Sequence, residues 1–550
     1  MLPAHYMGLR KVFADFPVPR EASTGLPVGG LAGLEEHYRD LSKRYGYTLA
    51  ASEADINDLG YKYLYAKPPD LASAISTLKH NTELFPDSPN AFDSLSDAYF
   101  RSRQGEAGIA SGEKAVALAR EQKDSRLERL ESDLTYYWLG VASLKAWFGQ
   151  DAELASTARH AVEHAAGSTD PVVLERTGQM ALLASKADKE QAKAGLNLIR
   201  RAVELGKDHR FLPYFQLSLG VAEYRNGNYA AADQALSGAT LAGDTNYDVL
   251  CASAFYEAMS QFRQGKETEA RALLQEAISM MPPLPADPKD PLAGNHTQND
   301  LGPWMAYKEA ITLLKMEGPG ELEFKRRRDA LEDARGLIRK AIEEFASGLS
   351  RDATAHLAAA SADVPNNTEL SLLVAALQAW FGEDAELAAT VRRTTEFANG
   401  TSYPVTAERA AKSGLIRPSA DKAQLEASLA LARRAVELGK NDRDGLPWFQ
   451  MALGMAEYRS GNYPAADDAL REAVQISNDN RYVRLTASFY RAMSLFRQGK
   501  ENESRALFTQ TASTMKPLPI DEENPLGGNL MNDDLVAWMA YKEAKSLLKI

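Results

Sequence analysis

The sequence predicts an all-α protein, folded as a right-handed solenoid of helical hairpins in two homologous modules. Two observations carry this prediction. A long stretch of sequence occurs twice, and from residue 31 onward apolar residues recur at spacings of three and four, the period of a helix. Runs with strict alternation, which would indicate strands, are scarce. Repeats of this kind indicate an array in which each unit buries its apolar face against its neighbours.

The two copies are close in sequence. Residues 211–236 return as residues 445–470, and 17 of the 24 positions from Pro213 to Leu236 are identical. Lys207 corresponds to Lys440, whereas Pro213 corresponds to Pro447, so the second copy has one additional residue between these two points. We expect this inserted residue to lie in a turn between two helices, where a loop tolerates it.

Composition and repeats together divide the chain into five segments. Residues 1–30 are rich in Pro and Gly and form an irregular lead-in with a short helix around residues 6–13. The other segments are a helical repeat region (31–130), a first module (136–316), a linker with charged helices that begins at a Gly-Pro-Gly break (317–368) and a second module (369–550).

Within each copy, small and aromatic residues recur at a finer spacing. Small residues let two antiparallel helices approach closely, aromatic residues fill the wedge between neighbouring pairs, and glycine permits a tight turn. The first copy has Gly220, Tyr224, Gly227, Tyr229 and Leu236, and the second has Gly454, Tyr458, Gly461, Tyr463 and Leu470. This spacing resembles that of the tetratricopeptide repeat (TPR), which implies an inner groove lined by the first helix of each hairpin and a protein or peptide partner.

Charge and composition exclude several classes of partner. The net charge of −12 argues against nucleic acid, because affinity for phosphates comes from clustered Lys and Arg. The one dense basic run, residues 325–328, is interpreted as a solvated helix face. No apolar stretch reaches 18 residues, so we expect no membrane association and a cytoplasmic location. The single cysteine, Cys251, can form no intramolecular disulfide and is expected to be buried.

No catalytic motif is complete in the sequence. The nearest match to a G-x-S-x-G elbow, residues 108–112, has Ala110 in place of the nucleophile, and the kinase motifs are missing. His160, Glu163 and His164 form an H-x-x-E-H pattern that could hold zinc, but the second copy has Arg393, Glu396 and Phe397 there. We therefore predict a noncatalytic protein without metal or cofactor.

Aromatic and arginine residues on the first helices are the candidate protein-binding residues, because such side chains anchor peptides on concave surfaces. Packing within the solenoid is the alternative role for these side chains. They are Tyr214, Tyr224 and Arg225 in the first copy and Trp448, Tyr458 and Arg459 in the second. The proline-rich segments 282–301 and 516–535 are interpreted either as loops pinned across the solenoid or as binding loops.

Two further resemblances suggest an alternative function. Residues from about 136 to 550, with RRAVELGK, EYRSGNY and WMAYKEA, resemble the TPR tail of planctomycete-type bacterial serine/threonine kinases. Residues from about 1 to 120, with HYMGLRKVFADF and LEEHYRDLSKRYGY, resemble the helical tail of hydrolases similar to siderophore esterases. Both are auxiliary tails, so the resemblance implies a regulatory portion of an enzyme whose catalytic domain is not in this chain.

Overall fold

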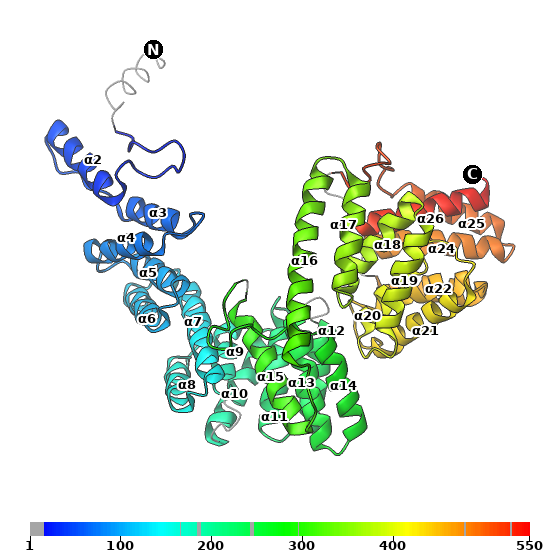
Figure 1. Ribbon diagram of the computed structural model, residues 1–550, viewed down its shortest axis with the longest axis horizontal. Coiled ribbons are helices and arrows are strands. Elements are labelled where there is room, and N and C mark those ends of the chain that lie inside the picture. The colour runs from blue at the N-terminus through cyan, green and yellow to red at the C-terminus, as the bar shows by residue number, and fades with distance from the viewer. Residues whose placement is uncertain are drawn as a thin grey trace, which may run out of the picture. The chain divides into compact units, whose positions relative to one another are not determined.

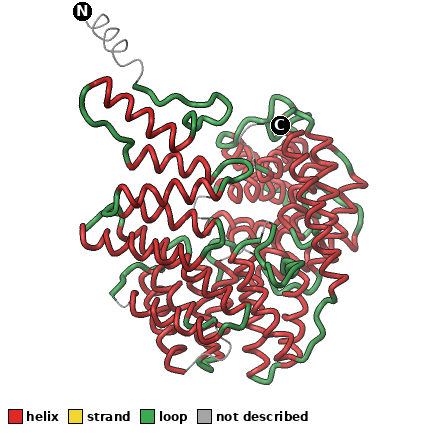
Figure 2. The backbone as a smooth tube through the Cα atoms, turned by 60° about the vertical axis from the view of Figure 1, so that its left-hand side comes forward, coloured by secondary structure: helices red, strands yellow, loops and turns green. Residues whose placement is uncertain are grey.

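The computed structural model describes residues 16–165, 167–183, 189–242, 247–294, 296–477, 480–527 and 531–550. The short helix predicted around residues 6–13 lies outside this part of the chain. Within it, the regular secondary structure is helical apart from one isolated β-bridge between Arg20 and Pro27 (Figures 1 and 2). The predicted all-α class is therefore confirmed.

The helices fall into two compact units, Met1–His209 and Arg210–Ile550. This division follows packing, whereas the predicted modules follow the sequence repeat, so the module boundaries stay a prediction. The first unit contains α2 (Gly30–Tyr45), α3 (Glu53–Leu64), α4 (Leu71–Leu84), α5 (Pro89–Arg101), α6 (Gly105–Gln122), α7 (Leu127–Trp147), α8 (Asp151–Ala165), α9 (Pro171–Met180) and α10 (Lys189–Leu205).

The second unit contains the remaining helices. They are α11 (Leu212–Arg225), α12 (Tyr229–Ala242), α13 (Tyr247–Arg263), α14 (Glu267–Met280), α15 (Gln298–Leu314), α16 (Glu321–Ala346), α17 (Ser350–Asp363), α18 (Thr368–Phe381), α19 (Asp384–Ala398), α20 (Pro404–Ser413), α21 (Lys422–Leu438), α22 (Leu446–Arg459), α23 (Tyr463–Ile476), α24 (Arg481–Arg497), α25 (Glu501–Ala512) and α26 (Asn532–Leu548).

Consecutive helices pair as hairpins, and the hairpins stack. In the first unit α3 packs on α4, α5 on α6 and α9 on α10, and in the second unit α11 packs on α12, α13 on α14, α20 on α21, α22 on α23 and α24 on α25. The first helices of successive hairpins also touch, as α11, α13 and α15 do. This stacking buries the apolar face of every hairpin against the next one.

Helices of the two copies begin at equivalent positions. Helix α8 begins at Asp151 and α19 at the corresponding Asp384, and α12 begins at Tyr229 and α23 at the corresponding Tyr463. The inserted residue of the second copy lies in the loop between α21 and α22, so it changes no helix.

The small residues of the repeat make the close helix contacts that the sequence predicts. A Cβ atom added to Gly220 of α11 would lie 2.4 Å from Cγ of Leu236 on α12, and one added to Gly454 would lie 2.3 Å from Cγ of Leu470. Both distances are too short for real atoms, so glycine sets the spacing of these hairpins. Gly227, in the following turn, has a φ of +80°, a left-handed conformation that favours glycine.

In the second copy, an early helix packs against one that is distant from it in the sequence. Helix α18 contacts α20, and it also contacts α26 at the end of the chain. The rings of Trp380 on α18 and Trp538 on α26 are 6.0 Å apart, and the Trp380 indole N–H donates to the carbonyl of Glu522 at 2.9 Å. Ser350 of α17 donates to Asn524 Oδ1 at 2.6 Å. The proline-rich segment before α26 is therefore pinned across α17 and α18.

The charged helix α16 holds the corresponding segment of the first copy. Arg327 Nη1 donates to the carbonyl of Ile278 at 2.7 Å, and Arg328 Nη1 donates to that of Leu284 at 2.9 Å. Lys325 is exposed, as expected for a solvated face. For Arg327 and Arg328 this interpretation was wrong, because both side chains are half-buried, Arg327 against the end of α14 and Arg328 against the proline-rich segment.

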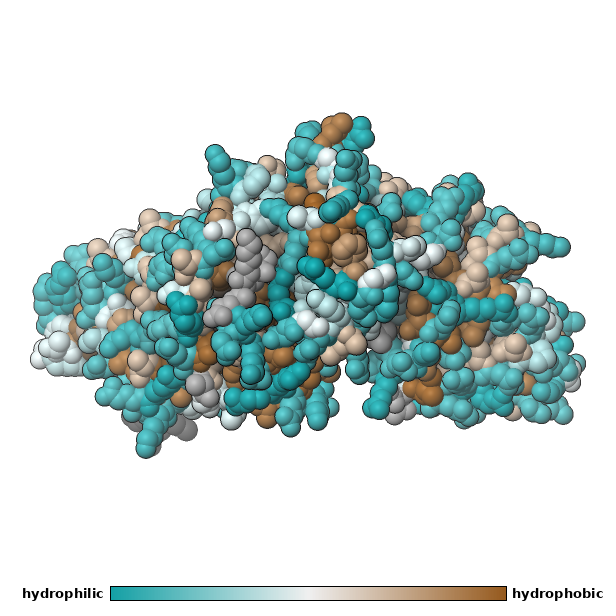
Figure 3. Space-filling model, turned by 90° about the horizontal axis from the view of Figure 1, so that it is seen from below, coloured by the Kyte–Doolittle hydropathy of each residue, from teal (hydrophilic) through white to brown (hydrophobic). Residues whose placement is uncertain are grey.

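Among the described residues, no helix is both long and apolar enough to cross a membrane. The face of the molecule seen in Figure 3 carries mostly hydrophilic side chains, with hydrophobic ones visible between them. Scattered apolar surface of this kind is normal for a folded protein.

Candidate functional site

Arg459, one of the predicted binding residues, is part of a buried hydrogen-bond network. Its side chain is 5% exposed and donates to both carboxylate oxygens of Glu543 on α26, at 2.5 and 2.7 Å. It also donates to the backbone carbonyls of Leu415 and Ile416 and to the Tyr490 hydroxyl, at 3.1, 3.2 and 2.7 Å. Burial by itself lowers the pKa of Arg459, but Tyr490 and Glu543 outweigh it and leave the pKa raised.

Arg225 occupies the equivalent place in the first copy with fewer partners. It binds both oxygens of Glu309 on α15, one of them at 2.6 Å, and donates to the Tyr256 hydroxyl at 3.2 Å. Its Nε is buried and has no hydrogen-bond partner within the described residues. Both arginines therefore tie the end of one hairpin to a helix 84 residues further on.

The two predicted tyrosines beside these arginines are also interior. Tyr224 and Tyr458 are each 7% exposed. The Tyr458 ring packs edge-on against Tyr490 at 5.6 Å, and Tyr224 packs in the same way against Tyr256 at 5.8 Å. The structure thus places four of the six predicted residues in internal packing and ion pairs, and contact of these four with a partner stays a prediction.

Trp448 and Tyr214, the other two predicted residues, are half-buried. Trp448 lies beside a buried ion pair: the ammonium of Lys412 is 4.6 Å from its ring and 2.8 Å from a carboxylate oxygen of Glu408. A cation over an aromatic face is attracted by the ring quadrupole. The first copy has Gln179 in place of Lys412, so this charge belongs to the second copy alone.

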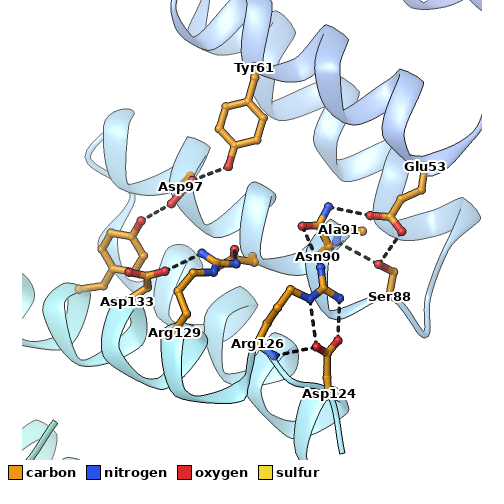
Figure 4. A network of polar contacts seen from close by, with 12 residues as sticks. Glu53, Tyr61, Ser88, Asn90, Ala91, Asp97, Asp124, Arg126, Arg129 and Asp133 are labelled. Carbon is orange, nitrogen blue, oxygen red and sulfur yellow. Dashed lines mark hydrogen bonds and ion pairs between the residues drawn. The ribbon is translucent and has the colours of Figure 1, made fainter. Parts of the chain in front are cut away.

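A polar network on the first helices of the N-terminal hairpins was missed by the sequence analysis (Figure 4). Asp97 of α5 lies at its centre and accepts hydrogen bonds from Tyr61 of α3, at 2.5 Å, and from Tyr137 of α7. Arg129 bridges Asp93 and Asp133 at 2.8 and 2.7 Å. Three helices are therefore joined through side chains that are not part of the apolar core.

The network continues toward the start of α5. Glu53 accepts from Ser88 and from Asn90, both at 2.8 Å, and Asn90 accepts from Arg126 at 3.3 Å. Arg126 in turn binds both oxygens of Asp124, at 3.0 and 2.6 Å. These contacts fix the side chains before any partner arrives, which reduces the entropy lost on binding.

Electrostatics in the network favour neutral tyrosines, and burial raises the pKa of Asp133 as well as that of Asp93. Burial and the Asp97 carboxylate raise the pKa of Tyr61 and of Tyr137 above the usual range, so both hydroxyls donate at neutral pH. Burial raises the pKa of Asp93 to about 6, although Arg129 opposes it. Asp93, Asp97 and Asp133 outnumber the two arginines that act on them, Arg129 and Arg176, so a negative excess remains on this surface. A periodicity search could not find it, because the residues come from three separate hairpins.

The H-x-x-E-H residues of α8 have other partners. His160 Nε2 lies 3.0 Å from Glu113, and His164 Nε2 lies 3.1 Å from Arg120. Both imidazole rings lie roughly perpendicular to the Trp138 ring. Burial, with Arg120 and His160, lowers the pKa of His164 to about 4. No group of three His, Cys, Asp or Glu residues suited to a metal occurs in the part of the chain that the structure describes.

Paired helices at TPR spacing, close glycine contacts and stacked first helices define an all-α, TPR-like solenoid. Solved structures similar to the chain include yeast Tom70, with 13% identity over 94% of this chain and 92% of that one and a TM-score of 0.23. The Cut9–Hcn1 hetero-tetramer of APC/C has 11% identity over 93% of this chain and 92% of that one, with a TM-score of 0.26. The P58(IPK) TPR domain has 14% identity over 75% of this chain and 99% of that one, with a TM-score of 0.17. No protein-family model and no curated protein matches the chain. Because these superpositions are poor, they carry no argument about function.

Proposed function

We propose that the chain is a noncatalytic protein- or peptide-binding scaffold whose partner lies along the first helices of its hairpins. The supporting observation is the network of α3, α5 and α7, which holds Asp97, Asp133 and Arg129 in fixed positions on first helices. Arg129 and Asp133 keep 52% and 40% of their side-chain surface exposed, so a partner can reach them. TPR-like arrays commonly use this face to bind extended segments of other proteins.

The charge of this surface suggests the kind of partner. Three carboxylates beside two guanidinium groups leave a negative excess that attracts a segment with Lys or Arg. Such complementarity speeds association and selects the partner. Nucleic acid is not proposed as a partner, since the net charge of the chain is −12.

A matched pair of double variants tests the proposal. Asp97→Asn with Asp133→Asn removes two charges from first helices, whereas Glu83→Gln with Glu121→Gln removes two from exposed positions of the second helices α4 and α6. Peptides selected from a random display library on the purified full chain should bind the first variant at least about tenfold more weakly and the second with unchanged affinity. Equal effects of the two variants, or no selected peptide at all, would contradict the proposal.

Trp448 and Tyr214 are the predicted residues that a partner could reach without unfolding the chain. We expect Trp448→Ala to weaken capture of a partner that spans the second copy while helicity is retained. Tyr458→Ala is unsuitable for this purpose, because removal of a buried aromatic ring costs about 3–5 kcal/mol and would disturb the hairpin itself.

The resemblance to kinase and esterase tails supports the alternative proposal of a regulatory or auxiliary portion of an enzyme. The DNA upstream of Met1 tests it, since an in-frame G-x-S-x-G domain or kinase domain there would favour this alternative. A cytoplasmic location and a bacterial origin also stay predictions, which cell fractionation and the genomic context would test.

A further inference from the structure

The two copies differ in charge at one place where their backbones are equivalent. Asp233 of α12 corresponds to Asp467 of α23, so this carboxylate is present in both copies. The residue of the next helix that faces it is Glu257 of α13 in the first copy and Arg491 of α24 in the second. A cation in one copy is thus replaced by an anion in the other.

In the second copy the site is complete. Arg491 Nε donates to Asp467 Oδ1 at 2.6 Å, and the two side chains are 28% and 12% exposed. The residues one turn before and after Arg491 are Ala487 and Leu495, both buried. The guanidinium is therefore held by one carboxylate in apolar surroundings.

In the first copy the same space is lined by acceptors. Gln264 donates to Asp233 Oδ2 at 2.7 Å, and Gln261 donates to Glu257 Oε1 at 3.2 Å. The other oxygens, Asp233 Oδ1 and Gln261 Oε1, are buried and have no hydrogen-bond partner among the described residues. Lys266 supplies a cation at the rim, and its exposed ammonium is 3.9 Å from Asp233.

The replacement of apolar side chains by polar ones extends along one face of α13. Ser253, Glu257 and Gln261 are spaced one helical turn apart and share this face. Ser253 is 0% exposed, and its hydroxyl is also without a hydrogen-bond partner among the residues described. Where the second copy has alanine and leucine, the first copy therefore has a hydroxyl and an amide oxygen, each able to accept a hydrogen bond.

The site of the first copy therefore has acceptors and negative charge that no donor or cation balances fully. Burial and the neighbouring Asp233 carboxylate raise the pKa of Glu257 to about 7. An unpaired buried acceptor costs free energy, and so do two carboxylates that face each other. A cation with several N–H donors would satisfy the free oxygens and offset the repulsion.

We propose that Asp233, Glu257 and Gln261 form a binding site for the guanidinium group of an arginine in a partner protein. The second copy shows the ligand chemistry, because its own Arg491 occupies the equivalent position against Asp467. A planar guanidinium with five donors suits two carboxylates and an amide oxygen better than the point charge of an ammonium. This inference rests on the proposed function, since it assigns one contact of the partner to the second unit.

Small probes test the site independently of any protein partner. N-acetyl-arginine methylamide should bind the full chain at pH 8, where Glu257 is mostly charged, at least about tenfold more tightly than the uncharged citrulline analogue. Saturation-transfer NMR measures both affinities. Asp233→Asn should weaken binding of the arginine probe by about tenfold or more, and Asp467→Asn should leave it unchanged because Arg491 already fills that site.

Exchange of the two side chains gives a sharper test. Glu257→Arg should abolish probe binding and increase hydrogen-exchange protection of α12 and α13, because its guanidinium can pair with Asp233 as Arg491 pairs with Asp467. This gain should disappear in the Glu257→Arg, Asp233→Asn double variant.

Three outcomes would overturn the inference. The first is equal binding of the arginine and citrulline probes, which indicates adventitious binding only. The others are unchanged binding of the arginine probe by Asp233→Asn and lower hydrogen-exchange protection in Glu257→Arg. Because no peptide partner is used, each of them would leave the proposed scaffold function untouched.

Discussion

Removal of the carboxylate charge should affect the two equivalent arginine sites unequally. In Glu309→Gln, Arg225 would keep the Tyr256 hydroxyl as a partner, and its Nε is already unpaired among the described residues. In Glu543→Gln, Arg459 would keep two backbone carbonyls and the Tyr490 hydroxyl. A buried ion pair that loses one member costs about 3–5 kcal/mol. We expect this loss for Glu309→Gln and about half of it for Glu543→Gln, since three acceptors still satisfy Arg459.

Hydrogen exchange followed by mass spectrometry is the appropriate assay, because a chain of this size need not unfold in one step. A loss of about 3 kcal/mol corresponds to about a hundredfold faster exchange through local opening. Protection should fall by this factor in α11, α13 and α15 of Glu309→Gln, and by about tenfold in α22, α24 and α26 of Glu543→Gln.

An exposed pair on α16 provides the control. Lys325 and Asp329 are 65% and 61% exposed and 3.2 Å apart, so Asp329→Asn should change stability by less than about 1 kcal/mol. The reasoning would be refuted by a loss of protection in Glu543→Gln that equals or exceeds the loss in Glu309→Gln. A response of the buried pairs no larger than that of the control would refute it as well.

Three further predictions concern packing and pH. Gly220→Ala should destabilise α11 and α12 by about 1–3 kcal/mol, seen as faster exchange of both helices, because the added methyl group collides with Leu236. Gly227→Ala adds no collision but places a side chain at a φ of +80°, so we expect a loss of about 1–2 kcal/mol in the same assay. The pKa of Glu257 is raised to about 7 in the folded state from a usual value of 4.5. Between these pH values the folded chain holds a proton that the unfolded chain releases. The stability of the folded state therefore falls as the pH rises from about 4.5 to about 7. Glu257→Gln should therefore raise the thermal midpoint at pH 8 and show a smaller gain at pH 6, and an equal gain at both pH values would contradict the raised pKa.

Local features were predictable from the sequence because each depends on a few neighbouring residues. Gly227 and Gly461 lie in turns with positive φ, and Gly220 approaches Leu236 as the repeat spacing implies. Helical periodicity was sufficient to predict the all-α class. The copy comparison also predicted that Cys251, which corresponds to Leu485, is buried.

The candidate site was harder to predict because it depends on contacts between distant helices. An arginine on a first helix has the same periodicity whether it faces a groove or pairs with a glutamate 84 residues away, as Arg459 does with Glu543. The Asp97 network draws its members from α3, α5 and α7, and no local pattern relates them. The difference between Glu257 and Arg491 was visible in the sequence, but its meaning required the position of Asp233.

The contact between α18 and α26 affects how the second copy is made. In an open array each repeat meets only its neighbours, so repeats can fold one after another as the chain leaves the ribosome. Here the indole of Trp380 finds its partner carbonyl at Glu522, 142 residues later. Non-local contacts of this kind slow folding, because the chain loses loop-closure entropy before the contact forms. During synthesis the side of α18 that packs on α26 therefore stays uncovered until α26 has been made.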